Sequence, residues 1–311
     1  MNVLDLVGNT PLLELKKISE GTPGVSIYAK AEFCNPSGSV KDRAAKAMLL
    51  EGIETGKLRP GKTIVDASSG NTGIAYAMLG ASLGFPVTIY LPANASSERK
   101  TILKCYHARI VETDPMESSD GAFLTAKAEA EAHPDKYFFP NQYNNDANWK
   151  AHFNSTGVEI WEQTGHKVTH FITGMGTSGT FMGTSRRLKD FNPAIQVIAV
   201  QPDSPFHGIE GTKHMGTTIK PGFYDETLPD GFAEVSTEGA YAMARRLACE
   251  EGILAGISSG ANVLAALNLA KTVPAGSLIV TIICDSGSRY LSDPFWEEAE
   301  IATDNSAGGS R

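Results

Sequence analysis

The chain has 311 residues, of which 41% are hydrophobic and 20% are charged, and this balance is typical of a globular protein with a buried core. At roughly 150 residues per domain, the length predicts about two domains. The 27 basic and 35 acidic residues give a formal net charge of −8 without any basic run, which argues against a nucleic-acid or anionic-membrane partner and favours a small-molecule substrate.

The N-terminus and the cysteines indicate a cytoplasmic protein. The opening MNVLDLVGNTP has no basic segment and no continuous apolar stretch, so we expect no signal peptide. The absence of a C-x-x-C pair argues against a zinc site and a disulfide framework, and predicts buried free thiols. The four cysteines are Cys34, Cys105, Cys249 and Cys284. His166 and His170 lead into a predicted strand rather than a helix, so no metal site is predicted.

Short β-branched runs alternate with amphipathic stretches in the first half of the chain. TIVDA (63–67) and VTIYL (87–91) are typical of buried strands, and each precedes a stretch with helical periodicity. The second of these helices opens with a Ser-Ser-Glu start signal. ARIVET and a helical stretch around 119–133 continue the alternation. The polar stretch PNQYNNDAN (140–148) then predicts a hinge.

The alternation resumes after about residue 145. NWKAHFNSTGVEIWEQTG (148–165) predicts one helix, and VTHFIT and IQVIAVQ predict strands on either side of a further helix. The segment 204–231 has little periodicity and much glycine and proline, which predicts a long functional loop such as a lid. Two more helices precede the strand SLIVTIIC (277–284). Almost continuously apolar strands between helices predict an α/β fold with mostly parallel sheets covered on both faces.

Three glycine-rich turns precede predicted helices, and the first is SSGNTG at 68–73. It follows a strand and opens a helix, where unpaired N–H groups at the positive end of the helix dipole would suit a carboxylate or a phosphate. A tight turn with an N-cap residue would give the same pattern. These residues alone leave both interpretations open.

The second turn, FITGMGTSGTFMG, has Gly174, Gly176 and Gly179 in the G-x-G-x-x-G spacing of a dinucleotide-binding loop. Asp203, at the end of the next predicted strand, would be the acid that binds an NAD ribose. The turn also contains three hydroxyl residues, which would suit a single compact phosphate, namely Thr177, Ser178 and Thr180. A phosphate-ester site, a dinucleotide site and a plain turn all stay open here.

The third turn, GISSG at 256–260, matches the G-x-S-x-G of a hydrolase nucleophile. That architecture needs a histidine after the serine, whereas the last histidine of the chain is His214, so the hydrolase interpretation fails. Lys41 stands where NPSGSVKDRAA passes from a Ser-Gly-Ser turn into a helix. A lysine, two anion cradles and an isolated serine together suit pyridoxal phosphate.

Five motifs, in this order and spacing, resemble the cysteine synthase/cystathionine β-synthase family of fold type II pyridoxal-phosphate enzymes. The motifs are NPSGSVKDRAA, SSGNTGIA, GMGTSGT, EGILAGISSGAN and CDSGSRYLSD. The resemblance covers about residues 7 to 295, and it leaves little support for an NAD site. It implies two doubly wound α/β domains, 40–145 and 1–39 plus 146–297, with the active site in the cleft between them. The stretch 298–311 is predicted to be a disordered tail.

The resemblance also implies residue roles. Lys41 matches the lysine that forms the Schiff base with pyridoxal phosphate and then moves the α-proton, Asn71 matches the residue that hydrogen-bonds the ring O3′, and Ser258 matches the serine that faces the ring nitrogen. The phosphate loop matches Gly176, Thr177, Ser178, Gly179 and Thr180. The substrate-binding residues are Ser68, Ser69, Asn71, Thr72 and Gln142.

The implied reaction is a β-replacement. A neutral serine at the ring nitrogen makes the ring a weaker electron sink than an aspartate would, which favours prompt loss of a β-leaving group. O-acetyl-L-serine or O-phospho-L-serine would give an aminoacrylate, to which sulfide or another sulfur donor adds to form L-cysteine. Cystathionine β-synthase, serine or threonine dehydratase and a diaminopropionate-forming synthase are the alternatives on the same fold. More distant alternatives are an NAD-binding oxidoreductase and a catalytically silent binding protein.

Four residues, at three places in the sequence, bear on substrate choice. Ser68 stands where the family more often has threonine, and it keeps the hydroxyl. Cys284-Asp285 replaces the Pro-Ser of many cysteine synthases and resembles the B-type enzymes. Lys213, within HGIEGTKHM, matches the region from which phosphoserine-using relatives offer a cation, so we hypothesise that it supports O-phospho-L-serine use. The resemblance further implies a homodimer, and it leaves open a serine acetyltransferase or a sulfur-carrier protein as partner.

Overall fold

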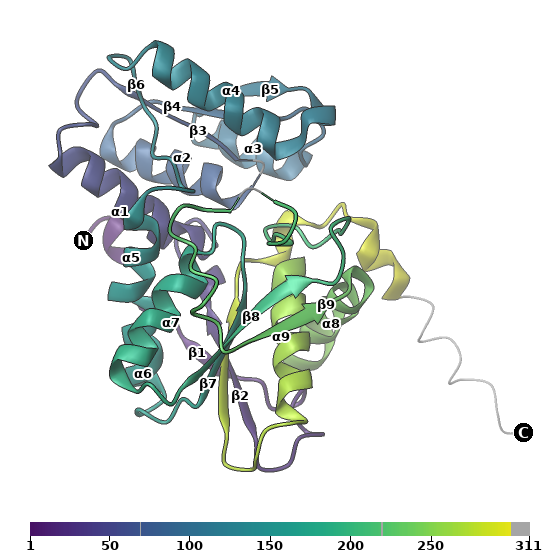
Figure 1. Ribbon diagram of the computed structural model, residues 1–311. Coiled ribbons are helices and arrows are strands. Elements are labelled where there is room, and N and C mark those ends of the chain that lie inside the picture. Colours follow the sequence, from purple (N-terminus) through teal and green to yellow (C-terminus); the bar gives the residue numbers. More distant parts are fainter. Residues whose placement is uncertain (69, 219, 300–311) are drawn as a thin grey trace, which may run out of the picture.

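The computed structural model of the protein describes residues 1–68, 70–218 and 220–299. Ser69 and residues 300–311 of the predicted tail lie outside the described residues. The chain forms a four-stranded and a six-stranded sheet, each flanked by helices, with the smaller sheet at the top of Figure 1. The predicted fold class, with two layers of mostly parallel strands, is confirmed.

The smaller sheet has the strand order β5-β4-β3-β6, and its paired strands are all parallel. Its strands are β3 (Thr63–Ala67), β4 (Val87–Pro92), β5 (Arg109–Thr113) and β6 (Tyr137–Phe138). The helices around it are α1 (Lys41–Glu54), α2 (Asn71–Leu83), α3 (Ser97–Cys105) and α4 (Ser118–Ala132). Ile64 packs in one core with α1 and α2, whereas its neighbour Val65 packs in another with α4, so both faces of the sheet are covered.

The larger sheet has the order β1-β2-β10-β7-β8-β9, in which only the β1–β2 pairing is antiparallel. Its strands are β1 (Leu12–Glu14), β2 (Ser26–Ala31), β7 (His170–Gly174), β8 (Gln196–Pro202), β9 (Gly231–Val235) and β10 (Leu278–Ile283). The helices that follow the smaller sheet are α5 (Asp146–Asn154), α6 (Thr156–Gln163), α7 (Gly179–Phe191), α8 (Thr237–Glu251) and α9 (Ile257–Ala270).

Strand β10 shows why this sheet is covered on both faces. Ile279 and Ile283 pack in a core with α8 and α9, whereas Val280 and Ile282 pack in a core with α6 and α7. This alternation follows from the two-residue period of a strand. Figure 1 shows α6 and α7 to the left of the strands and α8 and α9 to the right.

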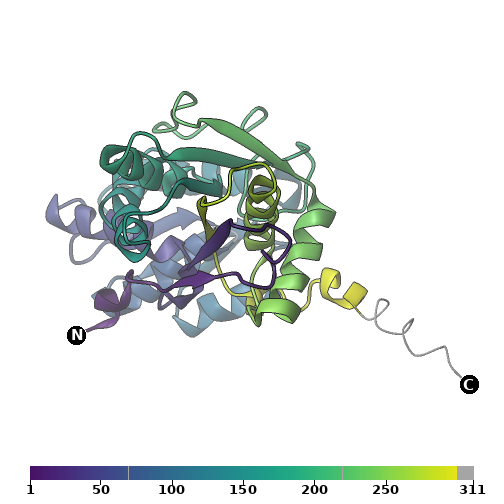
Figure 2. The same cartoon turned by 90° about the horizontal axis from the view of Figure 1, so that it is seen from below.

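The N-terminal segment joins the larger sheet. Strand β2 pairs in parallel with β10, so that Tyr28 lies opposite Val280 although the two residues are far apart in the sequence. Figure 2 shows this segment in purple beside the yellow-green C-terminal part of the chain. The domain boundaries at residues 40 and 145 stay a prediction.

Two local predictions were wrong. The helix predicted over 148–165 is two helices, because Ser155 leaves the helical conformation with φ −130° and ψ −71°. Its hydroxyl donates to the carbonyl of Ala151 and accepts from the Arg43 guanidinium. The free cysteines are also more exposed than predicted: Cys34, Cys105 and Cys249 are exposed, and Cys284 is half-buried.

Two further observations concern long segments. Between β8 and β9 the described residues form no helix or strand, as the sequence predicted for 204–231. In the described ranges, no helix combines the length and the apolar character needed to cross a bilayer.

Asp66 is a fully buried carboxyl group on the central strand β3. Its Oδ1 accepts the backbone N–H of Ala67 at 2.8 Å. Burial raises the pKa of Asp66 from 3.8 to about 7, and hydrogen bonding offsets only part of that rise. A raised carboxyl pKa means that the folded state binds the proton more tightly than the unfolded chain. The resulting contribution to stability is complete below pH 3.8 and is lost as the pH rises through about 7.

The wild type should lose stability as the pH rises, because Asp66 then ionises in a buried site. We expect Asp66→Asn to lose less, because its side chain cannot ionise. Urea unfolding gives the free energy of unfolding at pH 5 and at pH 8. The decrease between these two pH values should be smaller in the variant than in the wild type by on the order of 2 kcal/mol. Asp135, which is exposed, provides the control Asp135→Asn, and its pH dependence should match the wild type. Equal pH slopes for Asp66→Asn and the wild type would contradict this account.

Candidate active site

A cavity of about 750 Å³ lies between the two sheets. The smaller sheet contributes Ala67, at the carboxyl end of β3, and the larger contributes Gly174 and Cys284, at the ends of β7 and β10. Residues 207–213 of the β8–β9 loop line it as well. The carboxyl ends of parallel strands are where open α/β sheets bind their ligands, so this is the expected place for the site.

Four helices begin at the wall of this cavity. Their first residues, which all line it, are Lys41 of α1, Asn71 of α2, Gly179 of α7 and Ile257 of α9. The first turn of a helix has unpaired backbone N–H groups and the positive end of the helix dipole. The cavity is therefore suited to a ligand with anionic groups, such as a phosphate or a carboxylate.

The predicted site residues that the structure describes all line this one cavity. They are Lys41, Ser68, Asn71, Thr72, Gln142, Gly176, Thr177, Ser178, Gly179, Thr180, Lys213 and Ser258. Ser69 lies outside the described residues. The structure thus brings together residues from six separate stretches of the sequence, whereas their individual roles stay predictions.

The turn before Lys41 is fixed by two charged side chains. The Asp42 carboxylate accepts the backbone N–H of Ser37 at 2.7 Å and also its hydroxyl. Arg289 donates to the Ser37 carbonyl. Gly38 has φ +87°, and a Cβ there would lie 3.0 Å from the Arg289 guanidinium, so both its conformation and its surroundings require glycine. The start of α1 is therefore held rigidly where Lys41 enters the cavity.

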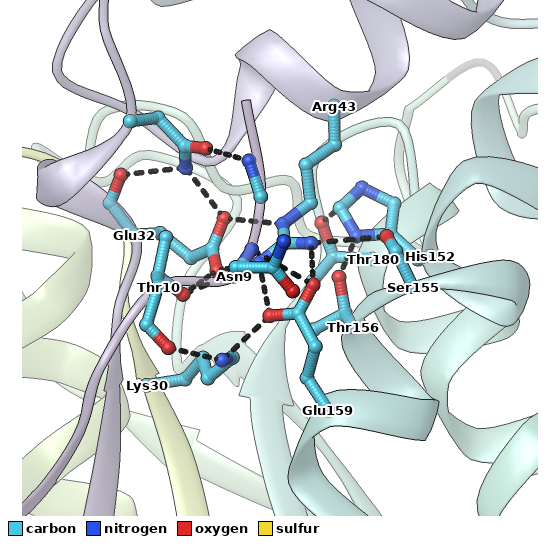
Figure 3. Close-up of polar contacts among 12 residues, drawn as sticks. Asn9, Thr10, Lys30, Glu32, Arg43, His152, Ser155, Thr156, Glu159 and Thr180 are labelled. Carbon is cyan, nitrogen blue, oxygen red and sulfur yellow. Dashed lines mark hydrogen bonds and ion pairs between the residues drawn. The ribbon is translucent and has the colours of Figure 1, made fainter. Parts of the chain in front are cut away.

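Four charged side chains form a buried group on the far side of α1, which we call the buried quartet: Lys30, Glu32, Arg43 and Glu159. Figure 3 shows Arg43 between the two carboxylates, 2.8 Å from Glu32 Oε1 and 2.6 Å from Glu159 Oε1. Lys30 Nζ lies 2.6 Å from Glu159 Oε2. Burial alone would raise the pKa of Glu159, but hydrogen bonds from Arg43 and the two cations lower it to about 2. With two basic and two acidic side chains, the quartet has no net formal charge.

Thr72 and Gln142 form a buried cradle together with Ser68. The Thr72 hydroxyl donates to Gln142 Oε1 at 3.1 Å, and Gln142 Nε2 donates to the Ala67 carbonyl at 3.3 Å. We call Ser68, Thr72 and Gln142 the carboxylate cradle, because they surround the N-terminus of α2 at the cavity wall. Hydroxyl and amide groups at a helix start are suited to an amino-acid carboxylate.

Asn71 is held by residues to which the sequence analysis gave no role in the cofactor site. Its Nδ2 donates to Asp285 Oδ2 at 2.7 Å, and Arg289 donates to its Oδ1. Tyr290 donates its hydroxyl to the same carboxylate oxygen at 2.7 Å. All three partners belong to the motif CDSGSRYLSD, so the signal was present in the sequence, but nothing local in it connects this motif to Asn71.

The phosphate loop joins β7 to α7. Ser178 has φ +64°, and among the described residues its buried hydroxyl has no hydrogen-bond partner. A Cβ at Gly179 would collide with the Asn148 carboxamide, so the loop can pass there only with glycine. Asn148 Nδ2 in turn donates to the Thr177 hydroxyl at 3.1 Å. Three hydroxyls, one of them unsatisfied, at the start of a helix fit the phosphate of pyridoxal phosphate.

Two of the groups that line the cavity from α9 and β10 are uncharged. Ser258 lines it at the start of α9, and Cys284 lies nearby at the end of β10. Burial raises the pKa of the Cys284 thiol to about 11, so the thiol is neutral at physiological pH. Its Sγ accepts a hydrogen bond from Asn262 Nδ2 at 3.4 Å. A ring nitrogen placed here would meet a hydroxyl rather than a carboxylate.

An ion pair between α3 and the β8–β9 loop lines the cavity. Arg99 of α3 pairs with Glu210 of the β8–β9 loop, and its guanidinium lies 4.9 Å from the centre of the Tyr290 ring. Lys213 lies in the same loop, with Nζ 4.0 Å from Asp120 Oδ1. Sequence reasoning missed Arg99 and Glu210, because nothing in SSERK or HGIEGTKHM distinguishes them from ordinary surface charges. In the described part of the chain, no cluster of three or more His, Cys, Asp or Glu could hold a metal ion.

The family model for pyridoxal-phosphate dependent enzymes matches residues 3–285. The chain is therefore a member of that class of enzymes, and its cofactor is pyridoxal phosphate, as the sequence predicted.

Within that class, the relatives are cysteine synthases. The cysteine synthase of Aquifex aeolicus is 51% identical over 303 residues, which cover 96% of this chain and 93% of the relative. Cysteine synthase B of Salmonella typhimurium is 39% identical and covers 97% of this chain and 98% of the relative. The crystal structure of a cysteine synthase from Entamoeba histolytica superimposes with a TM-score of 0.90 at 36% identity, over 95% of this chain and 90% of that one. The chain belongs to the cysteine synthase family, and the oxidoreductase and silent-protein interpretations are not favoured.

The unsatisfied hydroxyl of Ser178 gives a test of the phosphate loop. Ser178→Ala removes a group that has no partner among the described residues, so the apoprotein should keep its thermal midpoint, while its affinity for pyridoxal phosphate should fall about tenfold. Ser185 provides a matched control, because its hydroxyl is equally buried and unpartnered but does not line the cavity. A loss of affinity in Ser185→Ala, or an unchanged affinity in Ser178→Ala, would contradict this assignment.

Proposed function

We propose that the protein is a cysteine synthase that converts an O-activated L-serine and a sulfur donor into L-cysteine. The observation that carries the proposal is the convergence of Lys41, the carboxylate cradle and the phosphate loop on one cavity. A lysine amine, a carboxylate site and a phosphate site are the three fixed points that a β-replacement on an amino acid requires.

The cofactor has a place for each of its groups. The phosphate loop would hold its phosphate, Asn71 its ring oxygen, Ser258 its ring nitrogen and Lys41 its aldehyde carbon. When bound, pyridoxal phosphate supplies an electron sink for the α-carbon of the substrate. The neutral hydroxyl of Ser258 does not stabilise a cationic ring nitrogen as a carboxylate would, so loss of the β-substituent is favoured over a long-lived carbanion.

The side chains of the cavity bind and orient the substrate. The carboxylate cradle and the free N–H groups of α2 hold the substrate carboxylate, which places the α-carbon on the side of Lys41. The Lys41 amine then takes the α-proton and returns it after the sulfur donor has added. The Arg99–Glu210 ion pair joins the β8–β9 loop to α3 at the cavity wall, where it would help to exclude water from these steps.

Several finer points belong to the same proposal. We infer a homodimer that acts in the cytoplasm on small-molecule substrates, with a serine acetyltransferase or a sulfur-carrier protein as candidate partner. The support for each is the resemblance to the family. The two units, 40–145 and 1–39 plus 146–297, would move relative to each other about the stretch 140–148 when substrate binds.

The choice of leaving group is proposed to depend on Lys213. Its side chain lines the cavity from the β8–β9 loop, and its Nζ lies 4.5 Å from the centre of the Tyr143 ring and 4.0 Å from Asp120 Oδ1. Burial lowers its pKa, and the Asp120 carboxylate opposes that shift. A partly buried cation beside the substrate site would interact more strongly with a phosphate leaving group than with an acetyl group.

The assay combines the holoenzyme with sulfide and either O-acetyl-L-serine or O-phospho-L-serine, and measures L-cysteine. We expect Lys213→Ala to lower kcat/KM about tenfold for O-phospho-L-serine and less than about twofold for O-acetyl-L-serine. Lys220 lies in the same loop but is exposed and paired with Glu226, so Lys220→Ala is the control.

The two outcomes of this assay are separable. If neither donor gives cysteine with the wild type, the proposed function is wrong. If the wild type forms cysteine and Lys213→Ala uses O-phospho-L-serine as well as the wild type does, only the role of Lys213 is refuted.

A further inference from the structure

His152 of α5 is a fully buried histidine between the buried quartet and the phosphate loop (Figure 3). Its ring bridges two threonine hydroxyls. The Nδ1 atom lies 2.9 Å from Thr156 Oγ1, and the Nε2 atom lies 3.3 Å from Thr180 Oγ1. Thr180 lines the cavity in the first turn of α7, so the ring connects the protein interior to the phosphate loop.

The imidazole is neutral. Burial is the largest influence on its pKa and lowers it, and the cations of Arg43 and Lys41 lower it further. The carboxylates of Glu32 and Glu159 act in the opposite direction but are outweighed, so the pKa falls to about 3. A neutral imidazole has one N–H, so one ring nitrogen donates a hydrogen bond and the other accepts one. The direction of the whole chain of hydrogen bonds therefore depends on which nitrogen holds the proton.

Thr156 determines that choice. Its side chain is completely buried, and the hydrogen bonds of the described residues give its hydroxyl no partner except His152 Nδ1. If Nδ1 carried the proton, the hydroxyl hydrogen of Thr156 would be left buried without an acceptor, which costs about 1–3 kcal/mol. If Thr156 donates to Nδ1, that cost vanishes and the proton lies on Nε2. The Nε2–H then donates to Thr180.

We propose that His152 is a positioning residue: by donating its Nε2–H to Thr180 Oγ1, it leaves the Thr180 hydroxyl hydrogen to be donated to the phosphate of pyridoxal phosphate. The inference rests on the proposed function only in placing that phosphate in the loop 176–180. With the opposite tautomer, Thr180 would donate to the ring and present lone pairs to an anion, which is unfavourable.

Asn148, one helical turn before His152 on α5, supports this arrangement. Its Nδ2 donates to the backbone carbonyl of Gln142 at 2.7 Å, which fixes the orientation of the amide. The same Nδ2 donates to the Thr177 hydroxyl at 3.1 Å. Positions four apart lie on one face of a helix. Helix α5 thus presents two donors, Asn148 and His152, to two hydroxyls of the phosphate loop, and leaves both hydroxyl hydrogens available to an anion.

The tautomer can be observed directly in the wild type. Nitrogen-15 NMR of histidine-labelled holoenzyme between pH 6 and 8 should show one ring with a protonated Nε2 and an unprotonated Nδ1 that does not titrate. The chain has seven histidines, and the signal that disappears in His152→Gln identifies the ring. A protonated Nδ1, or a ring that titrates in this range, would overturn the proposal.

Two variants separate the donor role from packing. The amide of His152→Gln reaches the position of Nε2 and can still donate to Thr180, whereas the shorter amide of His152→Asn reaches only toward Thr156. The apoprotein of each is reconstituted with pyridoxal phosphate and, separately, with pyridoxal, which lacks the phosphate. We expect His152→Asn to bind pyridoxal phosphate about tenfold more weakly and pyridoxal within about twofold of wild type. His152→Gln should bind both within about threefold of wild type.

Controls make the outcomes distinct. His170→Asn alters a half-buried histidine of β7 that also contacts a threonine but does not line the cavity, and its affinities should be unchanged. Equal weakening for both ligands in His152→Asn would show a packing role and refute the donor role, as would an unchanged affinity for pyridoxal phosphate. If the wild-type apoprotein binds neither ligand, the proposed function itself fails.

Discussion

The buried quartet is the interaction on which the position of Lys41, the lysine proposed to carry the cofactor, depends. Removing four charges from water costs several kcal/mol per ion, and only a full set of hydrogen bonds offsets that cost. Arg43 meets this requirement with two carboxylates, and Lys30 completes the neutral group. Loss of one member would leave a buried charge unpaired at a cost of about 3–5 kcal/mol. The quartet therefore permits one arrangement of α1 against β2 and α6.

The N-terminal segment closes over the same group. The Thr10 hydroxyl donates to Glu32 at 2.7 Å, and the backbone N–H of Asn9 donates to Glu159 at 3.0 Å. Arg43 lies two positions after Lys41, which is more than half a turn around α1, so the two side chains leave the helix in nearly opposite directions. One face of α1 is thereby locked into the interior, while the other delivers the lysine amine to the cavity. His152 is hydrogen-bonded to Thr156 and to Thr180 of the phosphate loop, and the charges of Arg43 and Lys41 both act on its ring.

Much of the fold and the site could be predicted, and the exceptions share a physical cause. TIVDA (63–67) coincides with β3, because a buried parallel strand has a purely local apolar signature. The family resemblance implied N-terminal strands, but the local pattern did not predict strand β2. Its sequence SIYAKA includes Lys30, which looks like a surface residue until its partner Glu159 is known. The break at Ser155 likewise depends on Arg43, 112 positions away. Glycine-rich loops are recognisable from local chemistry, whereas the groups that orient them, such as His152 and Arg289, are placed only by the tertiary fold.

The most direct test of this account is to identify the residue that carries the cofactor. The holoenzyme would be reduced with borohydride, which fixes the bond between the cofactor and its lysine, and then digested and mapped by mass spectrometry. The account predicts a phosphopyridoxyl group on Lys41 and on no other lysine, because Lys41 is the lysine held at the start of α1 in the cavity wall. A label on Lys213, or an unmodified Lys41 in protein that has bound the cofactor, would contradict it.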